Sequence, residues 1–163
     1  MYCVLFEVEP REGLADTYFK LAVGMREEVE KIDGFLGVER FASDTRPGLY
    51  LSFSRWRDEA ALIEWRNVGK HQVMQARGRD DIFAAYRIRI GEETGEDGPR
   101  RVLVREHPSA VEASGEKFTA VFDPERSLSI DENSAPKDEN ARLFRIVRDY
   151  TMVDRAEAPQ HWA

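Results

Sequence analysis

A tryptophan and a histidine are the residues of this chain best suited to chemistry, and Trp65 precedes His71 by six positions. An imidazole exchanges a proton near neutral pH, and an indole offers a ligand a large, rigid apolar wall. Six positions do not share a face of a straight helix, but the Val68-Gly69 pair interrupts the helical pattern and lets the two rings converge. We predict that His71 and Trp65 form a catalytic pair. The alternative is that His71 is a partly buried helical residue bonded to a backbone carbonyl.

Further aromatic residues lie on segments that are expected to form strands. These residues are Phe6, Phe53, Trp56 and Tyr86. Large aromatic side chains suit the wall of a pocket for an aromatic ligand, and the Tyr86 hydroxyl could hold a substrate oxygen. We predict that the four side chains bind substrate. For each of them, and for Trp65, plain core packing is the alternative.

The sequence contains no motif for metal binding, for a nucleophile elbow or for phosphate binding. There is no Cys-x-x-Cys, His-Glu-x-x-His or Gly-x-Ser-x-Gly pattern and no glycine-rich loop before a helix, so we predict no metal site and no nucleophile elbow. Cys3 is the single cysteine, and we expect it to be a small buried apolar residue in a reducing compartment. His107 lies beside a proline and His161 lies in the C-terminal tail, so both are expected at the surface.

Charge and hydropathy exclude two classes of partner. The formal net charge of −7 argues against nucleic-acid binding, which needs a basic face. No segment approaches the roughly 18 apolar residues of a membrane span, and the first ten residues lack the pattern of a secretory signal. We therefore predict a cytoplasmic protein whose partner is a small-molecule substrate.

Hydrophobic periodicity predicts an α+β fold in residues 1–90. The expected strands are 2–8, 35–41, 49–56 and 82–90, and the expected helices are 14–32, 59–67 and 70–77. Gly34 suits the left-handed position after the first helix, and Asp58 suits the N-cap of the second. The resulting β-α-β-β-α-β order is that of a ferredoxin-like sandwich.

Both faces of the predicted sheet are apolar. On the first strand Cys3 and Leu5 lie opposite Val4, Phe6 and Val8. Helices in this arrangement cover one face only, so the other face needs a second cover. A partner sheet from a second copy is the simplest cover, and we predict a homodimer.

Arginines alternate with other residues along the predicted strands. Arg40, Arg87 and Arg89 could bind an anionic substrate, and the alternative that we favour is pairing with Glu7 and Glu39 across the sheet.

Residues 91–142 differ in character from the rest of the chain. They are rich in acidic residues and turn formers, and we predict an acidic inserted excursion in which 101–106 and 117–122 form a hairpin. Residues 143–163 would return to the first domain as a final strand and tail.

Several separate motifs agree in order with one known family. They are DGFLGVERF at 33–41, PG at 47–48, SFSRWRDE at 52–59, WR at 65–66, His71, Gln75, GR at 78–79, IFAAY at 82–86, VRDY at 147–150 and DRAEAP at 154–159. The pattern resembles the antibiotic biosynthesis monooxygenase family, from which this sequence departs by the insertion at 91–142. The resemblance implies a dimeric α+β barrel, in agreement with the two apolar faces. It also implies a choice among cofactor-free oxygenases of aromatic compounds, haem-degrading enzymes and members without an assigned activity.

The haem-degrading branch of the family is a poor match. That branch uses an asparagine on the first strand, where this chain has Phe6 or Glu7, and a histidine at the position of Gln75. We therefore predict no cofactor. The expected function is a monooxygenase or related oxidoreductase for a small aromatic or quinone-like compound, held between sheet and helices with His71 as proton acceptor or hydrogen-bond donor. A non-catalytic ligand-binding module and an interaction module on the same fold are the alternatives.

Overall fold

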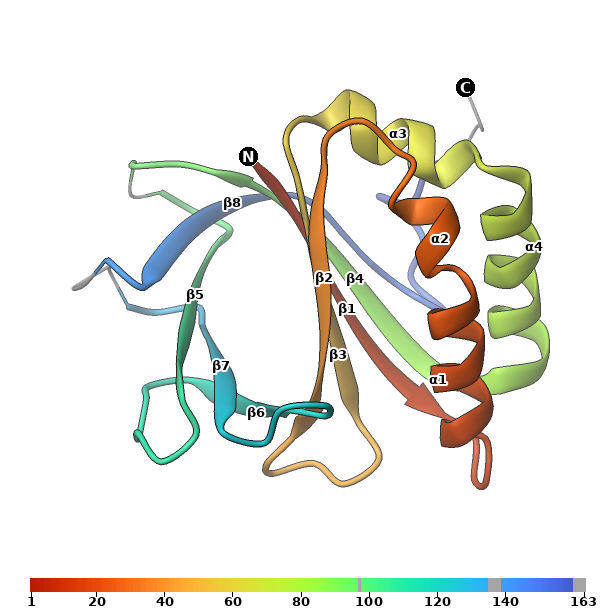
Figure 1. Cartoon of the computed structure of the whole chain (residues 1–163). Coiled ribbons are helices and arrows are strands. Elements are labelled where there is room, and N and C mark those ends of the chain that lie inside the picture. The colour runs from red at the N-terminus through yellow and green to blue at the C-terminus, as the bar shows by residue number, and fades with distance from the viewer. Residues whose placement is uncertain (97, 135–138, 160–163) are drawn as a thin grey trace.

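A closed barrel with helices against one side is the architecture of the chain in the computed structural model (Figure 1). The structure describes residues 1–96, 98–134 and 139–159. Within these residues eight strands follow one another around the barrel in the order β1-β3-β2-β6-β7-β5-β8-β4. His161, expected at the surface, lies outside the described residues.

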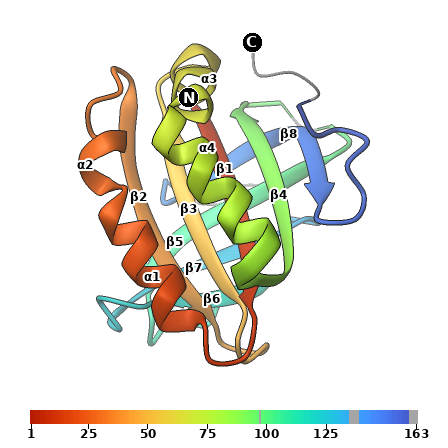
Figure 2. The same ribbon diagram turned by 90° about the vertical axis from the view of Figure 1, so that its right-hand side faces the viewer.

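The first half of the chain confirms the α+β prediction. Its elements are β1 (Tyr2–Pro10), α1 (Ala15–Gly24), α2 (Arg26–Val29), β2 (Phe35–Ser43), β3 (Tyr50–Trp56), α3 (Glu59–Asn67), α4 (Gly69–Arg77), the short π-helical turn η1 (Gly78–Ile82) and β4 (Phe83–Glu93). The strands lie side by side as β4-β1-β3-β2, the ferredoxin-like order. Figure 2 shows the helices covering one face of this sheet.

Local sequence signals set the helix boundaries in this half. Asp58 caps α3 by accepting a hydrogen bond from the Ala61 backbone N–H at 2.9 Å, and Gly34 has the positive φ of 97° that was expected of it. The helix predicted over 14–32 is divided in two, because α1 ends at Gly24 and α2 begins at Arg26. Glycine weakens a helix interior, which accounts for a break at this position.

The second half contributes four more strands. They are β5 (Arg101–Pro108), β6 (Glu116–Ala120), β7 (Arg126–Asp131) and β8 (Ala141–Thr151). Their order, β8-β5-β7-β6, repeats that of the first half, in which the fourth strand is followed by the first, the third and the second. Residues 109–115, which join β5 to β6, carry no helix, whereas the equivalent connection in the first half carries α1 and α2. In the part of the chain that the structure describes, the second half is therefore a sheet of ferredoxin-like order without helices that cover it.

The pairing of the predicted strands 101–106 and 117–122 differs from the expected hairpin. These segments correspond to β5 and β6, but β7 lies between them and pairs with both. The two sheets join edge to edge where β2 pairs with β6 and where β4 pairs with β8. Residues 91–142 thus supply part of the barrel wall.

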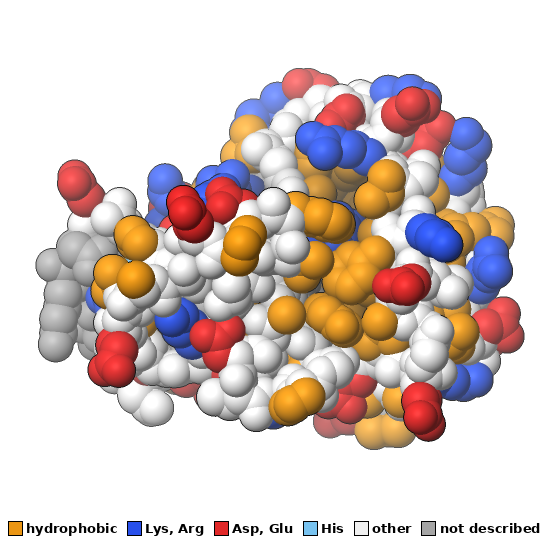
Figure 3. Space-filling view, turned by 60° about the horizontal axis from the view of Figure 1, so that its bottom comes forward, with side chains coloured by type: hydrophobic (Ala, Val, Ile, Leu, Met, Phe, Trp, Pro, Cys, Tyr) orange, Lys and Arg blue, Asp and Glu red, His pale blue; other side chains and the backbone are white. Residues whose placement is uncertain are grey.

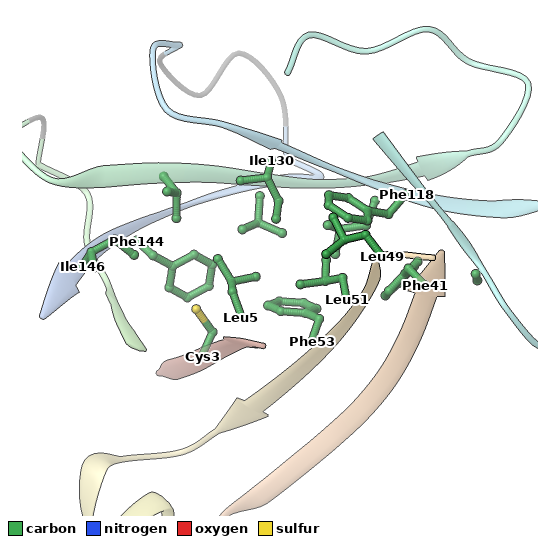
Figure 4. Close-up of a cluster of buried hydrophobic side chains, with 14 residues drawn as sticks. Cys3, Leu5, Phe41, Leu49, Leu51, Phe53, Phe118, Ile130, Phe144 and Ile146 are labelled. Carbon is green, nitrogen blue, oxygen red and sulfur yellow. The ribbon is translucent and has the colours of Figure 1, made fainter. Parts of the chain in front are cut away.

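The barrel interior is filled by apolar side chains from both sheets. Cys3, Leu5 and Phe53 of the first sheet face Phe118 and Phe144 of the second (Figure 4). The apolar face that was expected to need a partner copy is therefore covered by strands of the same chain. The prediction that a second copy supplies this layer is wrong, because β5–β8 of the same chain supply it. A homodimer of this chain would use another surface.

The outer face of the first sheet packs against the helices. One cluster there gathers Trp56, Ile90 and Leu62 around α3, and a second gathers Val8, Tyr18, Ile82, Phe83 and Tyr86 near α1 and η1. The helices of the described residues are all too short or too polar to cross a membrane.

Candidate functional site

The break between α3 and α4 brings the predicted catalytic pair together. Val68, which separates the two helices, has an extended conformation with φ −62° and ψ 122°. The chain therefore turns between Trp65 and His71, and their rings stack with centroids 4.1 Å apart and planes 18° from parallel. Both side chains are partly buried. The convergence expected from Val68-Gly69 is present in the structure.

The hydrogen bond of His71 determines which ring nitrogen is available. Nδ1 lies 3.1 Å from the backbone carbonyl oxygen of Trp65. Because a carbonyl only accepts, Nδ1 carries the hydrogen and Nε2 carries the free lone pair. Burial lowers the pKa of His71 to about 4, although the hydrogen bond to the Trp65 carbonyl acts in the opposite direction. The ring is thus neutral at pH 7, and its Nε2 can accept a proton or a hydrogen bond.

Burial of His71 predicts a pH-dependent stability. The folded pKa of about 4 lies below the ordinary value of 6.5, so the unfolded chain binds the additional proton between these pH values. The unfolding free energy should be highest above pH 6.5 and should fall by up to about 3 kcal/mol as the pH drops to 4. Urea unfolding of the native chain and of His71→Phe between pH 4 and 6.5 measures the contribution of His71 to the unfolding free energy. The prediction would be contradicted if the difference in unfolding free energy between the two proteins did not change from pH 4 to 6.5.

The predicted substrate-binding residues do not form one group. Phe6 and Tyr86 lie together on the helix side of the sheet, with ring centroids 5.9 Å apart. Trp56 packs in the neighbouring cluster, which also contains Trp65, and is 1% exposed. Phe53 points to the opposite face of the sheet, into the barrel core. Strand alternation explains the separation of Phe53 from Trp56, because three positions along a strand reverse the face.

Further residues extend the aromatic cluster around Phe6. Phe83 contacts Phe6 with centroids 5.7 Å apart, and Tyr18 of α1 contacts Phe83 at the same separation. Tyr18 also has a hydrogen bond with Arg40, while burial raises the pKa of its hydroxyl. The aromatic character of these residues was the available sequence signal, but their meeting depends on how α1 and η1 pack.

Tyr86 is held by a residue near the C-terminus. Arg155 donates a hydrogen bond to the Tyr86 hydroxyl at 2.5 Å, and its guanidinium lies 5.6 Å from the centre of the Tyr150 ring. This cation–π contact and the hydrogen bond fix the tail over the sheet. No local sequence pattern indicated Arg155, because the contact joins residues 69 positions apart.

Apolar side chains also reach the surface. Figure 3 shows hydrophobic side chains gathered in the middle of one face of the molecule. Phe122 is 73% exposed and contacts Phe19, which in turn contacts Tyr50. The chain of aromatic contacts beside α1 therefore extends to the protein surface.

Two of the three arginines that the sequence analysis singled out form ion pairs. Arg89 pairs with Glu7 across the sheet as expected, at 2.9 Å, whereas Arg87 pairs with Asp149 of β8. Glu39 pairs with Arg126 of β7, which the sequence did not suggest. Among the described residues, no three His, Cys, Asp or Glu side chains come together as a potential metal site.

The strand order and the helices define a class of protein, the α+β barrels built from ferredoxin-like sheets. Within that class, the model of the antibiotic biosynthesis monooxygenase family matches residues 1–77. The match covers slightly less than half of the chain, and it confirms the resemblance read from the sequence motifs.

Known proteins similar to this chain cover it to different extents. Jasmonate monooxygenase ABM of Pyricularia oryzae is 42% identical over 94 residues, which are 58% of this chain and 44% of that relative. The match thus spans less than half of the relative. The solved structure of Rv0793 from Mycobacterium tuberculosis is 18% identical and covers 60% of this chain and 98% of its own, with a TM-score of 0.52. A Lactobacillus acidophilus structure, 10% identical with a TM-score of 0.50, covers 88% of this chain and 76% of its own, so the likeness of fold extends into the second half.

Proposed function

We propose that the chain is a cofactor-independent monooxygenase, or a related oxidoreductase, for a small aromatic or quinone-like compound. The observation that carries the proposal is the neutral His71, stacked on Trp65 with its free lone pair on Nε2. The match of residues 1–77 to the model of a family of monooxygenases supports the same reaction class. The single cysteine is a buried free thiol, as suits the reducing cytoplasm that we include in the proposal.

The expected substrate position is on the helix side of the first sheet. Phe6, Tyr86 and Trp65 lie on this side and offer the apolar walls that an aromatic ring needs. The Tyr86 hydroxyl already accepts a hydrogen bond from Arg155, which leaves its own hydrogen free to reach a substrate oxygen. Phe53 is left out of the proposed site, because it packs in the barrel core.

The reaction needs a base and no external reductant. His71 Nε2 would take a proton from an acidic CH or OH group of the substrate, and the resulting anion would react with molecular oxygen. When a CH2 group becomes C=O, one oxygen atom enters the product and the other leaves as water with the two hydrogens. For a CH2 group the substrate supplies all four electrons, so the atoms and charges balance. A hydroquinone would instead give two electrons and two protons to oxygen, and the products would be a quinone and hydrogen peroxide.

Removal of the base should abolish oxygen uptake. His71→Phe keeps a ring against Trp65 but has no lone pair, and we expect the rate with a hydroquinone to fall at least about 100-fold. An oxygen electrode with product analysis measures it. The native rate should be constant above about pH 5 and should decline below pH 4, where His71 becomes protonated.

A second histidine provides the matched control. His107 lies on β5, away from the helices, and His107→Gln should keep the native rate. Full activity in His71→Phe would exclude His71 as the base. Jasmonate, for which the Pyricularia relative is named, is a second test substrate. If the protein consumes oxygen with neither the hydroquinone nor jasmonate, the result would count against the monooxygenase proposal.

Ligand binding without turnover is the second candidate function. The hydrogen bond from His71 to a backbone carbonyl is also what a structural histidine forms, and a pKa of about 4 makes a weak base. This candidate predicts thermal stabilisation of the chain by the same compounds without oxygen uptake or product.

A further inference from the structure

A pocket of about 600 Å³ lies on the barrel side of the first sheet, opposite the helix side. It is bounded by the ends of β1, β4 and β8 and, across from them, by the end of β7 and the start of β6. Its volume falls in the range of pockets that hold small organic ligands. Of the residues in the proposed monooxygenase site, Tyr86 also lines this pocket, whereas His71, Trp65 and Phe6 do not.

A buried arginine forms part of the pocket wall. Arg89 is 3% exposed, and its Nη2 donates to Glu7 at 2.9 Å while its Nη1 donates to Glu132 at 2.8 Å. Its Nε is buried without a hydrogen-bond partner. A buried charge with donors to spare is costly in a folded protein, so an additional acceptor would be favourable here.

A second arginine lies beside it, two positions along β4. Arg87 donates to both carboxylate oxygens of Asp149, at 2.9 and 2.6 Å, and holds the pKa of that carboxyl below its usual range. The remaining terminal nitrogen of Arg87 is 3.9 Å from Glu132, too far for a hydrogen bond. Glu132 therefore satisfies Arg89 but only approaches Arg87.

Glu132 is the one of these carboxylates that a ligand could replace. Its side chain is 56% exposed and directly follows β7, whereas Glu7 is buried and Asp149 is bound by two hydrogen bonds. The other acidic residues of the lining are Glu9, Glu116 and Asp131. Glu116 is held by two hydrogen bonds from Arg46, and Asp131 accepts from Ser134 and from backbone N–H groups.

We propose that this pocket binds a small monocarboxylate, which takes the place of Glu132 and bridges Arg87 and Arg89. Planar guanidinium groups match carboxylate oxygens in geometry and charge. The exchange substitutes one negative charge for another, while a dianion such as phosphate would add charge near Glu9 and Glu116. Leu49, Ile130 and Met152 of the lining can contact an apolar body.

The proposed carboxylate site and the site beside His71 adjoin at Tyr86, which also lines the pocket. His71, Trp65 and Phe6 are not among the lining residues. His71→Phe should therefore stop oxygen uptake and leave carboxylate binding intact, so the failure of one proposal can be told from the failure of the other.

Calorimetric titration with hexanoate tests the proposal, with hexanamide and inorganic phosphate as comparison ligands. We expect saturable binding of hexanoate, at least tenfold weaker binding of hexanamide, and phosphate weaker than hexanoate. Glu132→Ala removes the internal competitor and should tighten hexanoate binding about fivefold or more. Arg87→Met should weaken it about tenfold or more, since a charged hydrogen bond is lost.

Arg87 is chosen because loss of the buried Arg89 would leave Glu7 without its partner and endanger folding. Arg145→Met is the matched control, because Arg145 is an exposed arginine that pairs with Glu92 away from the pocket. It should bind hexanoate as the native chain does. Equal affinity for hexanoate and hexanamide, or unchanged affinity in both Glu132→Ala and Arg87→Met, would overturn the proposal, as would the absence of saturable binding.

Discussion

Replacement of Phe144 by alanine should lower the unfolding free energy by about 3–5 kcal/mol, the cost of removing a fully buried ring. Phe144 belongs to β8 and is 0% exposed in the barrel core (Figure 4). Its position allows little relaxation, because a Cβ placed on the facing Gly91 would lie 2.8 Å from the Phe144 Cβ. Urea denaturation followed by tryptophan fluorescence measures the change.

Phe122 supplies the matched control for Phe144. It is the same residue type in the same half of the chain, but it is 73% exposed. Phe122→Ala should change the unfolding free energy by no more than about 0.5 kcal/mol. Equal effects of the two substitutions would mean that the second half of the chain does not complete the core.

The first half of the fold could be predicted because its signals are local. Strand alternation, helical spacing and two boundary residues, Asp58 and Gly34, each act within a few positions of the chain. Their combined order allows few topologies, and the ferredoxin-like order is among them.

The second half could not be predicted to the same extent, because β6 and β7 are short, with five and six residues, and carry many polar side chains. β7 alternates Leu128 and Ile130, which face the core, with Ser127 and Ser129, which are each 2% exposed. The alternation is present in the sequence, but serines beside Pro124 are also typical of a loop. Pairing of β7 with both β5 and β6 depends on contacts between distant residues, which no local pattern specifies.

The candidate site shows the same division between local and distant effects. The stack of His71 on Trp65 follows from a helix break that the sequence displays at Val68-Gly69. The hydrogen bond of Arg155 to Tyr86 and that of Arg89 to Glu132 depend on segments that meet only in the folded barrel. Sequence reasoning therefore found the histidine and raised Arg87 and Arg89 as possible anion-binding residues, but it could not place Glu132 and Asp149 beside them.

The repeated strand order has a consequence for the number of sites. Two ferredoxin-like sheets face each other, and among the described residues only the first sheet has helices against its outer face. In the second half, residues 109–115 stand where the first half has a helical connection. They form no helix and contain no histidine. Within the described residues, one barrel therefore has one helix-covered site.

A chain that ends at Glu93 should self-associate, because it loses the strands that cover the barrel side of its first sheet. Leu5, Leu51 and Phe53 would become exposed from at most 4% in the complete chain, at a cost of about 1.5–3 kcal/mol for each side chain. A second copy offers the same apolar face, so pairing of two sheets would recover this free energy. Sedimentation velocity at micromolar concentration should find dimers or larger species of the truncated chain, while circular dichroism reports whether its helices persist. A truncated chain that is folded and monomeric at these concentrations would contradict the argument, since its sheet would then tolerate water on the face that β5–β8 now cover.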